Sequence, residues 1–282
     1  MPLFMSLPPY QPSHHEESSA VAPRETTQGQ AASRELKRNF VVLFFHGMLG
    51  QTGFRLLQAP TFLPTYIATL TGSNAAAGMA RAIQSLGSFV SPMVSARMIE
   101  HRTHVKRMGI GVGALMRVQV LFLALIALFL PRESAVYLVW VAIGVWGLAS
   151  GMQMVVFNFL LSKAIPISHR GRLHGFRNLT SAVTLLFVSA IAGWLLESYG
   201  FPSGYGWAFL LSFVLTSAGL VFLLLLREPP SDEIRAPVPF LDRIRQVPAL
   251  LRDEPQFARF VRARLFATGA RAALPFYILT IR

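Results

Sequence analysis

The 282-residue chain contains no cysteine and few charged residues. Without cysteine it can form neither a disulfide framework nor a cysteine-ligated zinc site, and it has no thiol nucleophile. Charged residues make up 14% of the chain, whereas an ordinary soluble domain has about a quarter. Hydrophobic residues make up 53%, which is more apolar surface than a soluble core of this size can bury. These shortages exclude a disordered protein and argue against a cytosolic enzyme.

Acidic residues are also scarce, with 13 Asp and Glu against 26 Lys and Arg, for a net charge of +13. Such an excess indicates nucleic-acid binding in a soluble protein and cytoplasmic loops in a membrane protein. Here the basic residues are dispersed among apolar stretches and form no single stripe, so we expect no nucleic-acid partner. The polar residues 1–39 have no apolar core typical of a signal peptide and are predicted to be a disordered cytoplasmic tail.

Seven apolar stretches follow this tail, and each is close to or above the roughly 20 residues that a helix needs to cross a bilayer. They cover residues 40–69, 75–97, 108–130, 135–161, 174–197, 206–226 and 260–281. None alternates polar and apolar residues with period two, which excludes a transmembrane barrel. The sequence therefore predicts an all-α, polytopic transmembrane helical bundle embedded in a lipid bilayer.

Proline and glycine indicate how these helices bend and pack. The first stretch, about 30 residues long, exceeds the thickness of the hydrocarbon core, so we expect it to bend at Pro60 or Pro64. Glycines recur at steps of three or four in the first and fourth stretches, and small residues let membrane helices approach closely. These glycines are Gly47, Gly50, Gly53, Gly144, Gly147 and Gly151.

Positive charge alternates between the two sides of the predicted bundle. The tail and the connections after the second, fourth and sixth stretches hold most of the Lys and Arg residues, whereas Arg132 alone occupies the connections on the other side. The connection after the fourth stretch is predicted to include Lys163, Arg170, Arg172 and Arg177. The positive-inside rule then places the N-terminus in the cytoplasm, and we expect the protein to reside in the plasma (inner) membrane.

Several short sequences at the ends of the predicted spans indicate a family resemblance. The first stretch ends in the sequence Phe62–Ile67 and leads to the small residues of 72–78, a short basic connection joins the second and third stretches, and the sixth stretch closes with Leu226–Pro229. In these features the chain resembles the N-terminal half of a major facilitator superfamily (MFS) transporter. The resemblance implies a secondary transporter of a small solute that works by alternating access of two six-span halves. It implies neither an enzyme nor a cofactor.

The resemblance also implies how the chain is divided. It predicts a six-span N-terminal half over 40–226, a cytoplasmic connection over 227–259 and a seventh span over 260–282. Because transporters of this family have twelve spans, we expect this chain to be a fragment, with the missing C-terminal half supplied in cis or in trans. The alternatives are a non-transporting membrane protein, such as a scaffold or an inactive remnant, and more remotely an intramembrane serine protease. The protease is disfavoured because the sixth stretch has no histidine to act as a base.

The connection between the second and third stretches departs from the family signature Gly-x-x-x-Asp-Arg-x-Gly-Arg-Arg. The glycines are missing, Glu100 is the candidate for the acidic position, and Arg102 and Arg107 are the candidate basic residues. The alternative to a specific function is a solvated positive loop that fixes the topology.

Polar residues inside the apolar stretches are the candidate functional residues, because ionisable groups at membrane depth are costly unless they are paired. Gln51, Arg55 and Gln58 share one helix face, and the resemblance implies that this face lines the transport cavity. The fourth stretch adds Gln153 and Asn158 as substrate-binding candidates, and His46 and Arg117 are candidates for proton transfer or gating. A neutral buried histidine and a snorkelling arginine are the respective alternatives. No Asp or Glu lies deep in any stretch, so the unpaired arginines favour an anionic substrate, and no metal site is expected.

Overall fold

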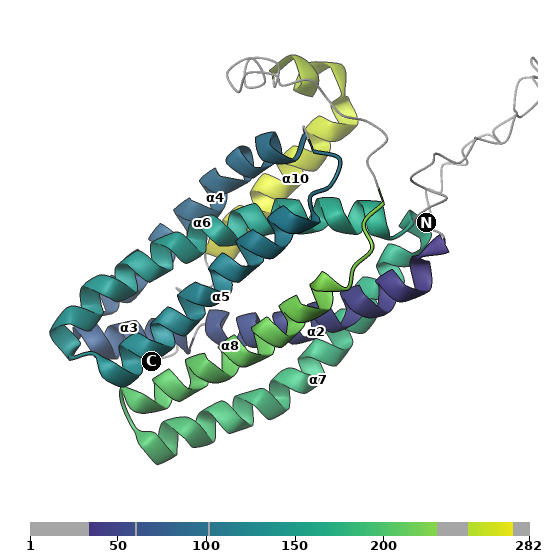
Figure 1. Ribbon diagram of the computed structural model, residues 1–282. Coiled ribbons are helices and arrows are strands. Elements are labelled where there is room, and N and C mark those ends of the chain that lie inside the picture. Colours follow the sequence, from purple (N-terminus) through teal and green to yellow (C-terminus); the bar gives the residue numbers. More distant parts are fainter. Residues whose placement is uncertain (1–33, 60, 101, 230–247, 273–282) are drawn as a thin grey trace, which may run out of the picture. The chain divides into compact units, whose positions relative to one another are not determined.

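The computed structural model describes residues 34–59, 61–100, 102–229 and 248–272. The chain divides into two compact units, residues 1–96 with 102–233 and residues 97–101 with 234–282. The first unit contains α2 (Leu36–Gln58), α3 (Leu63–Thr71), most of α4 (Asn74–Glu100), α5 (Lys106–Phe129), α6 (Arg132–Ala164), α7 (Ile167–Tyr199) and α8 (Ser203–Leu224) (Figure 1). The second unit contains α10 (Pro255–Ala272).

The predicted all-α bundle is confirmed, because the described residues form helices and no strand. Five segments of the described chain are long and apolar enough to cross a membrane, namely Leu36–Thr71, α5, α6, α7 and α8. The helix α4 has sufficient length, but its many Ala, Gly and Ser residues together with Arg81 lower its hydropathy. The predicted seventh span, 260–281, lies partly outside the described residues.

The first predicted span is interrupted, as its length and prolines predict. Helix α2 ends at Gln58 and α3 begins at Leu63, with Pro64 in the first turn of α3, where a missing N–H is tolerated. Pro60 lies outside the described residues. Gly72 ends α3 with a left-handed φ of 73°, a conformation that glycine adopts without steric cost.

The predicted basic loop between the fourth and fifth spans is wrong. Only Ile165 and Pro166 separate α6 from α7, so Arg170, Arg172 and Arg177 lie on α7, and Lys163 lies in the last turn of α6. The 33-residue α7 is about 50 Å long at 1.5 Å per residue, well beyond a hydrocarbon core of about 30 Å. The first two turns of α7 therefore precede the apolar stretch 174–197 from which the start of the fifth span is predicted.

Helices α4 and α6 touch through their backbones, as the small residues predict. Ser88 of α4 donates to the Gly147 carbonyl at 3.1 Å, and its hydroxyl lies 2.8 Å from that of Ser150. A Cβ at Gly147 would lie 2.5 Å from the Gln84 carbonyl oxygen, whereas a Cβ at Gly144 would make only an ordinary contact. Of these two glycines, Gly147 is therefore the one that permits the close approach.

We expect Gly147→Ala to lower the free energy of unfolding by about 1–3 kcal/mol, because the added methyl group meets backbone that cannot move aside. Gly193→Ala on α7 is the matched control, since a Cβ there meets nothing within 4 Å and alanine favours a helix. Thermal unfolding of the detergent-solubilised chain measures both variants. Equal midpoints would contradict the close packing of α4 against α6.

The first unit has two chemically different ends. At one end, Phe62 and Tyr66 pack against Tyr205 and Phe209, with ring centroids 5.2–5.5 Å apart. At the other end, where α2, α5 and α7 begin and α6 and α8 finish, the Asn39 side chain donates to the Arg227 carbonyl at 2.9 Å. We call these the aromatic end and the basic end.

Candidate functional site

The predicted polar face of α2 contacts α7 at two of its three residues. Arg55 donates from Nη1 to Ser181 Oγ at 3.0 Å and from Nη2 to Asn178 Oδ1 at 3.1 Å. Ser181 in turn donates to Gln51 Oε1 at 3.2 Å. The sequence reasoning found Gln51 and Arg55 but not their α7 partners, because which helix packs against α2 is not encoded locally.

Arg177 is a second arginine of this region. It is not among the residues that the sequence predicts as functional, because its position groups it with the basic connection that precedes the fifth stretch. It lies one helical turn before Ser181, is only 5% exposed, and packs against Gly47 of α2, where a Cβ would collide with its guanidinium. Its guanidinium carbon lies 5.0 Å from the centre of the Phe157 ring. Its Nε and Nη1 are buried and have no hydrogen-bond partner in the described part of the chain.

Arg117 is the third arginine and is 4% exposed. It donates from Nε to the Thr216 carbonyl at 2.7 Å and from Nη1 to the Gly113 carbonyl at 2.6 Å. Backbone carbonyls of α8 and α5 therefore stabilise the charge of Arg117. A Cβ at Gly113 would contact both Arg117 Nη1 and the unpartnered Gln153 Oε1, so these two side chains flank the same glycine.

The two remaining candidates, His46 and Asn158, differ in burial, since His46 is buried and Asn158 is exposed. The His46 Nδ1 lies 2.8 Å from the Gly219 carbonyl, and because a carbonyl only accepts, this nitrogen carries the proton. The arrangement is the one expected for a buried histidine bonded to a neighbour. The His46 ring centroid lies 5.4 Å from that of Phe157, the ring that also contacts Arg177.

We call Arg55, Arg117 and Arg177 the arginine cluster, because all three lie along α2. Arg177 packs at Gly47, a Cβ at Gly50 would lie 3.9 Å from Arg117 Nη2, and Arg55 is in the last turn of the helix. Arg117 and Arg177 are each about ten residues, or roughly 15 Å of helix, from the basic end. The ion pairs Lys163–Glu228 and Arg227–Glu35 both lie at the basic end, and neither involves an arginine of the cluster. Arg117 and Arg177 therefore carry buried positive charge, and partly buried Arg55 adds to it, while none of the three forms an ion pair with a carboxylate in the described residues.

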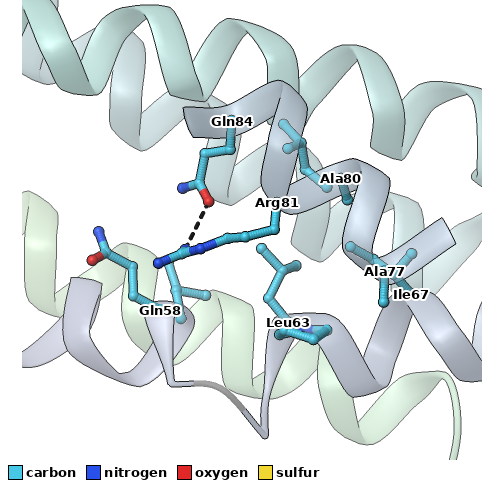
Figure 2. Close-up of a pocket in the computed structure, with 10 residues that line it drawn as sticks. Gln58, Leu63, Ile67, Ala77, Ala80, Arg81 and Gln84 are labelled. Atoms are coloured by element: carbon cyan, nitrogen blue, oxygen red, sulfur yellow. Dashed lines mark hydrogen bonds between the residues drawn. The ribbon is translucent and has the colours of Figure 1, made fainter. Parts of the chain in front are cut away.

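The third residue of the predicted face, Gln58, lies elsewhere. As the last residue of α2, it lines a pocket with Arg81 and Gln84 of α4, and Arg81 Nη1 donates to Gln84 Oε1 at 2.9 Å (Figure 2). The three-residue face is thus divided between two neighbours, because α2 ends at Gln58 and the chain turns toward α3.

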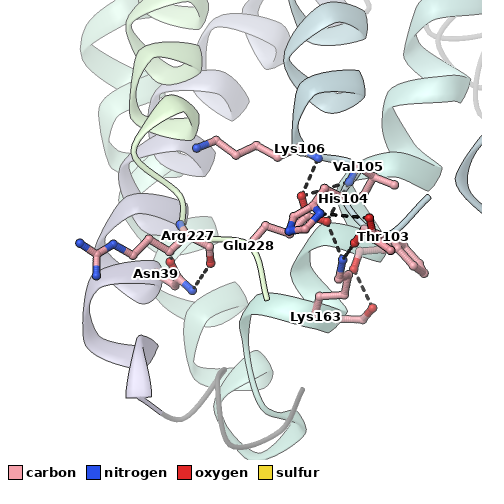
Figure 3. Close-up of polar contacts among 10 residues, drawn as sticks. Asn39, Thr103, His104, Val105, Lys106, Lys163, Arg227 and Glu228 are labelled. Carbon is pink, nitrogen blue, oxygen red and sulfur yellow. Dashed lines mark hydrogen bonds and ion pairs between the residues drawn. The ribbon is translucent and has the colours of Figure 1, made fainter. Parts of the chain in front are cut away.

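The connection between α4 and α5 is organised by an acid that the sequence reasoning did not select. Glu228, which follows α8, forms an ion pair with Lys163 at 2.6 Å, and the two side chains are 3% and 1% exposed (Figure 3). The Glu228 carboxylate also accepts the backbone N–H groups of Val105 and Lys106 at 2.8–3.0 Å. It therefore caps the start of α5, where a helix favours negative charge.

Lys106 adds a second link between the start of α5 and the end of α8, because its Nζ donates to the carbonyls of Leu224 and Leu226. Of the predicted motif residues, Arg102 and Arg107 are exposed, and the side chain of Glu100 lies outside the described residues. The sequence contains a signal for each partner of the buried ion pair. Glu228 lies just after the sixth predicted span, and Lys163 lies just after the fourth.

Comparison with protein families identifies the class of this bundle. The family model described as Major Facilitator Superfamily matches residues 40–281. The chain belongs to this superfamily of secondary transporters and is a multi-pass membrane protein. Among curated proteins, none matches the chain.

Proposed function

We propose that the chain binds a small anionic solute at the arginine cluster and carries it across the membrane by alternating access. The observation that supports this proposal most directly is Arg177, a cation that is 5% exposed and whose Nε and Nη1 have no partner in the described residues. An unpaired buried charge costs several kcal/mol, which a bound anion would offset.

The donors of the cluster suit an oxyanion. A guanidinium is planar and presents its N–H groups in a fork that matches carboxylate and phosphate oxygens. Arg177 offers buried N–H groups, and Arg55 lies one helical turn of α7 away through its bond to Ser181. Gln51 and Gln153 add neutral polar groups beside the cations.

In the proposed transport cycle, the two ends of the bundle face opposite sides of the membrane. The basic end would face the cytoplasm of the plasma (inner) membrane, in accord with the positive-inside rule, and the N-terminus would lie on that side. A second six-helix half, supplied in cis or in trans, would close the cluster alternately from each side.

Thermal unfolding in the presence of added solutes tests the proposal. We expect at least one oxyanion among inorganic phosphate, succinate, benzoate and nitrate to raise the unfolding midpoint of the purified chain, because a ligand that binds only the folded state stabilises it. Choline and sucrose serve as cationic and neutral controls at matched ionic strength.

A stabilisation that is the same for all salts, or absent for all four anions, would overturn the anionic substrate. It would instead favour a bundle that does not transport, such as a scaffold.

A further inference from the structure

A polar pocket separate from the arginine cluster lies between the end of α2, α4 and α6. Its volume is about 300 Å³, at the lower limit of typical ligand pockets. It is lined by Gln58, Arg81, Gln84, Ser85, Ser88, Phe89 and Ser150. It adjoins the apolar pocket of Figure 2, which shares Gln58, Arg81 and Gln84.

Hydrogen bonds position four of the side chains that line this pocket, Arg81, Gln84, Ser88 and Ser150, and Arg81 itself is exposed. Gln84 is 6% exposed, and its Oε1 accepts from Arg81 Nη1 at 2.9 Å, which fixes the guanidinium across the pocket. The hydroxyls of Ser88 and Ser150 lie 2.8 Å apart and are anchored at the Gly147 carbonyl. The site therefore has one cation, several hydroxyl and amide groups, and no carboxylate among its lining residues.

We infer that this pocket is a second oxyanion-binding site, which receives a small solute bearing a carboxylate or phosphate group before it reaches the arginine cluster. Its cation leaves four guanidinium N–H groups beyond the one donated to Gln84. Gln58, which lines the pocket, lies three residues after Arg55 on α2, so about 5 Å of helix separates the pocket from the arginine cluster at this point. The site does not depend on Arg177 or Arg117.

The absence of cysteine from the chain permits a direct test. A Ser85→Cys variant places one thiol in the pocket, and its reaction rates with a sulfonate-bearing and a trimethylammonium-bearing methanethiosulfonate are compared. After normalisation to free mercaptoethanol, we expect about a tenfold preference for the anionic reagent, as for a cleft lined by positive charge. Adding Arg81→Gln should abolish the preference, whereas adding Arg172→Gln, which changes an exposed arginine of α7, should leave it intact.

Protection of the thiol identifies the bound group. Benzoate or succinate should slow the reaction if the site takes carboxylates, and inorganic phosphate should slow it if the site takes phosphates. A rate ratio near one, a ratio that Arg81→Gln leaves unchanged, or a thiol that neither reagent reaches would overturn the inference. Ser150→Cys provides a second reporter from α6 if the first variant does not fold.

The two proposals fail separately in these experiments. Loss of the reagent preference with retained anion stabilisation of the unfolding midpoint would remove the second site only. Retained preference without anion stabilisation would remove the arginine cluster as a substrate site.

Discussion

Glu228→Gln is expected to lower the free energy of unfolding by about 3–5 kcal/mol, because it leaves the buried Lys163 ammonium without its counter-charge. The same change weakens the acceptor for the backbone N–H groups that begin α5. Glu228 joins the ends of α5, α6 and α8, so we expect the lower free energy to appear in the unfolding of the whole bundle. Thermal or denaturant unfolding in detergent measures it.

The control for this prediction is a second ion pair at the basic end, which is more exposed. Arg227 and Glu35 are 58% and 31% exposed, and exposed pairs contribute about 0–1 kcal/mol, so Glu35→Gln should change stability little. A combined Lys163→Met and Glu228→Gln variant should recover part of the loss, because it removes the orphaned charge. Equal effects of Glu228→Gln and Glu35→Gln would contradict the buried ion pair.

Local sequence patterns predict some of these features and not others. The helices, the break before Pro64 and the close approach at Gly147 follow from hydropathy, proline chemistry and residue size, which act locally. Glu228 and Lys163 lie 65 positions apart, and no local pattern indicates that they meet. The family resemblance directed attention to Glu100 instead.

Arg177 illustrates a second kind of error. Arg177 lies close to the start of the predicted stretch 174–197, and an arginine at the edge of an apolar stretch is grouped with the adjacent basic connection. The length of α7 and its packing against Gly47 bring this residue inside the bundle. Arg55, which lies well within an apolar stretch, was identified because its surroundings in the sequence are themselves apolar.

Arg177→Met is expected to stabilise the protein in anion-free buffer by about 1–3 kcal/mol while it abolishes stabilisation by oxyanions. The substitution removes a buried cation that lacks a protein counter-charge, and methionine fills an apolar space of similar length. The cation–π contact with Phe157 is lost, but it offsets only about 2 kcal/mol of the burial cost. Unfolding midpoints with and without the effective anion measure both effects.

Arg172→Met is the matched control, since Arg172 lies on the same helix and is exposed. It should leave both the anion-free midpoint and the anion response unchanged. A merely structural Arg177 would show the opposite sign, with Arg177→Met destabilising the protein in anion-free buffer, and that result would remove the binding function assigned to this residue.

Equilibrium dialysis of a radiolabelled oxyanion against the purified chain tests the buried cation site most directly. The anion that raises the unfolding midpoint most is used, at constant ionic strength. The wild-type chain should bind it saturably, and Arg177→Met should weaken this binding by at least about 30-fold, the loss expected when one member of a desolvated charge pair is removed. Binding that fails to saturate, or that is equally tight in Arg177→Met, would contradict an anion site built on the buried arginines.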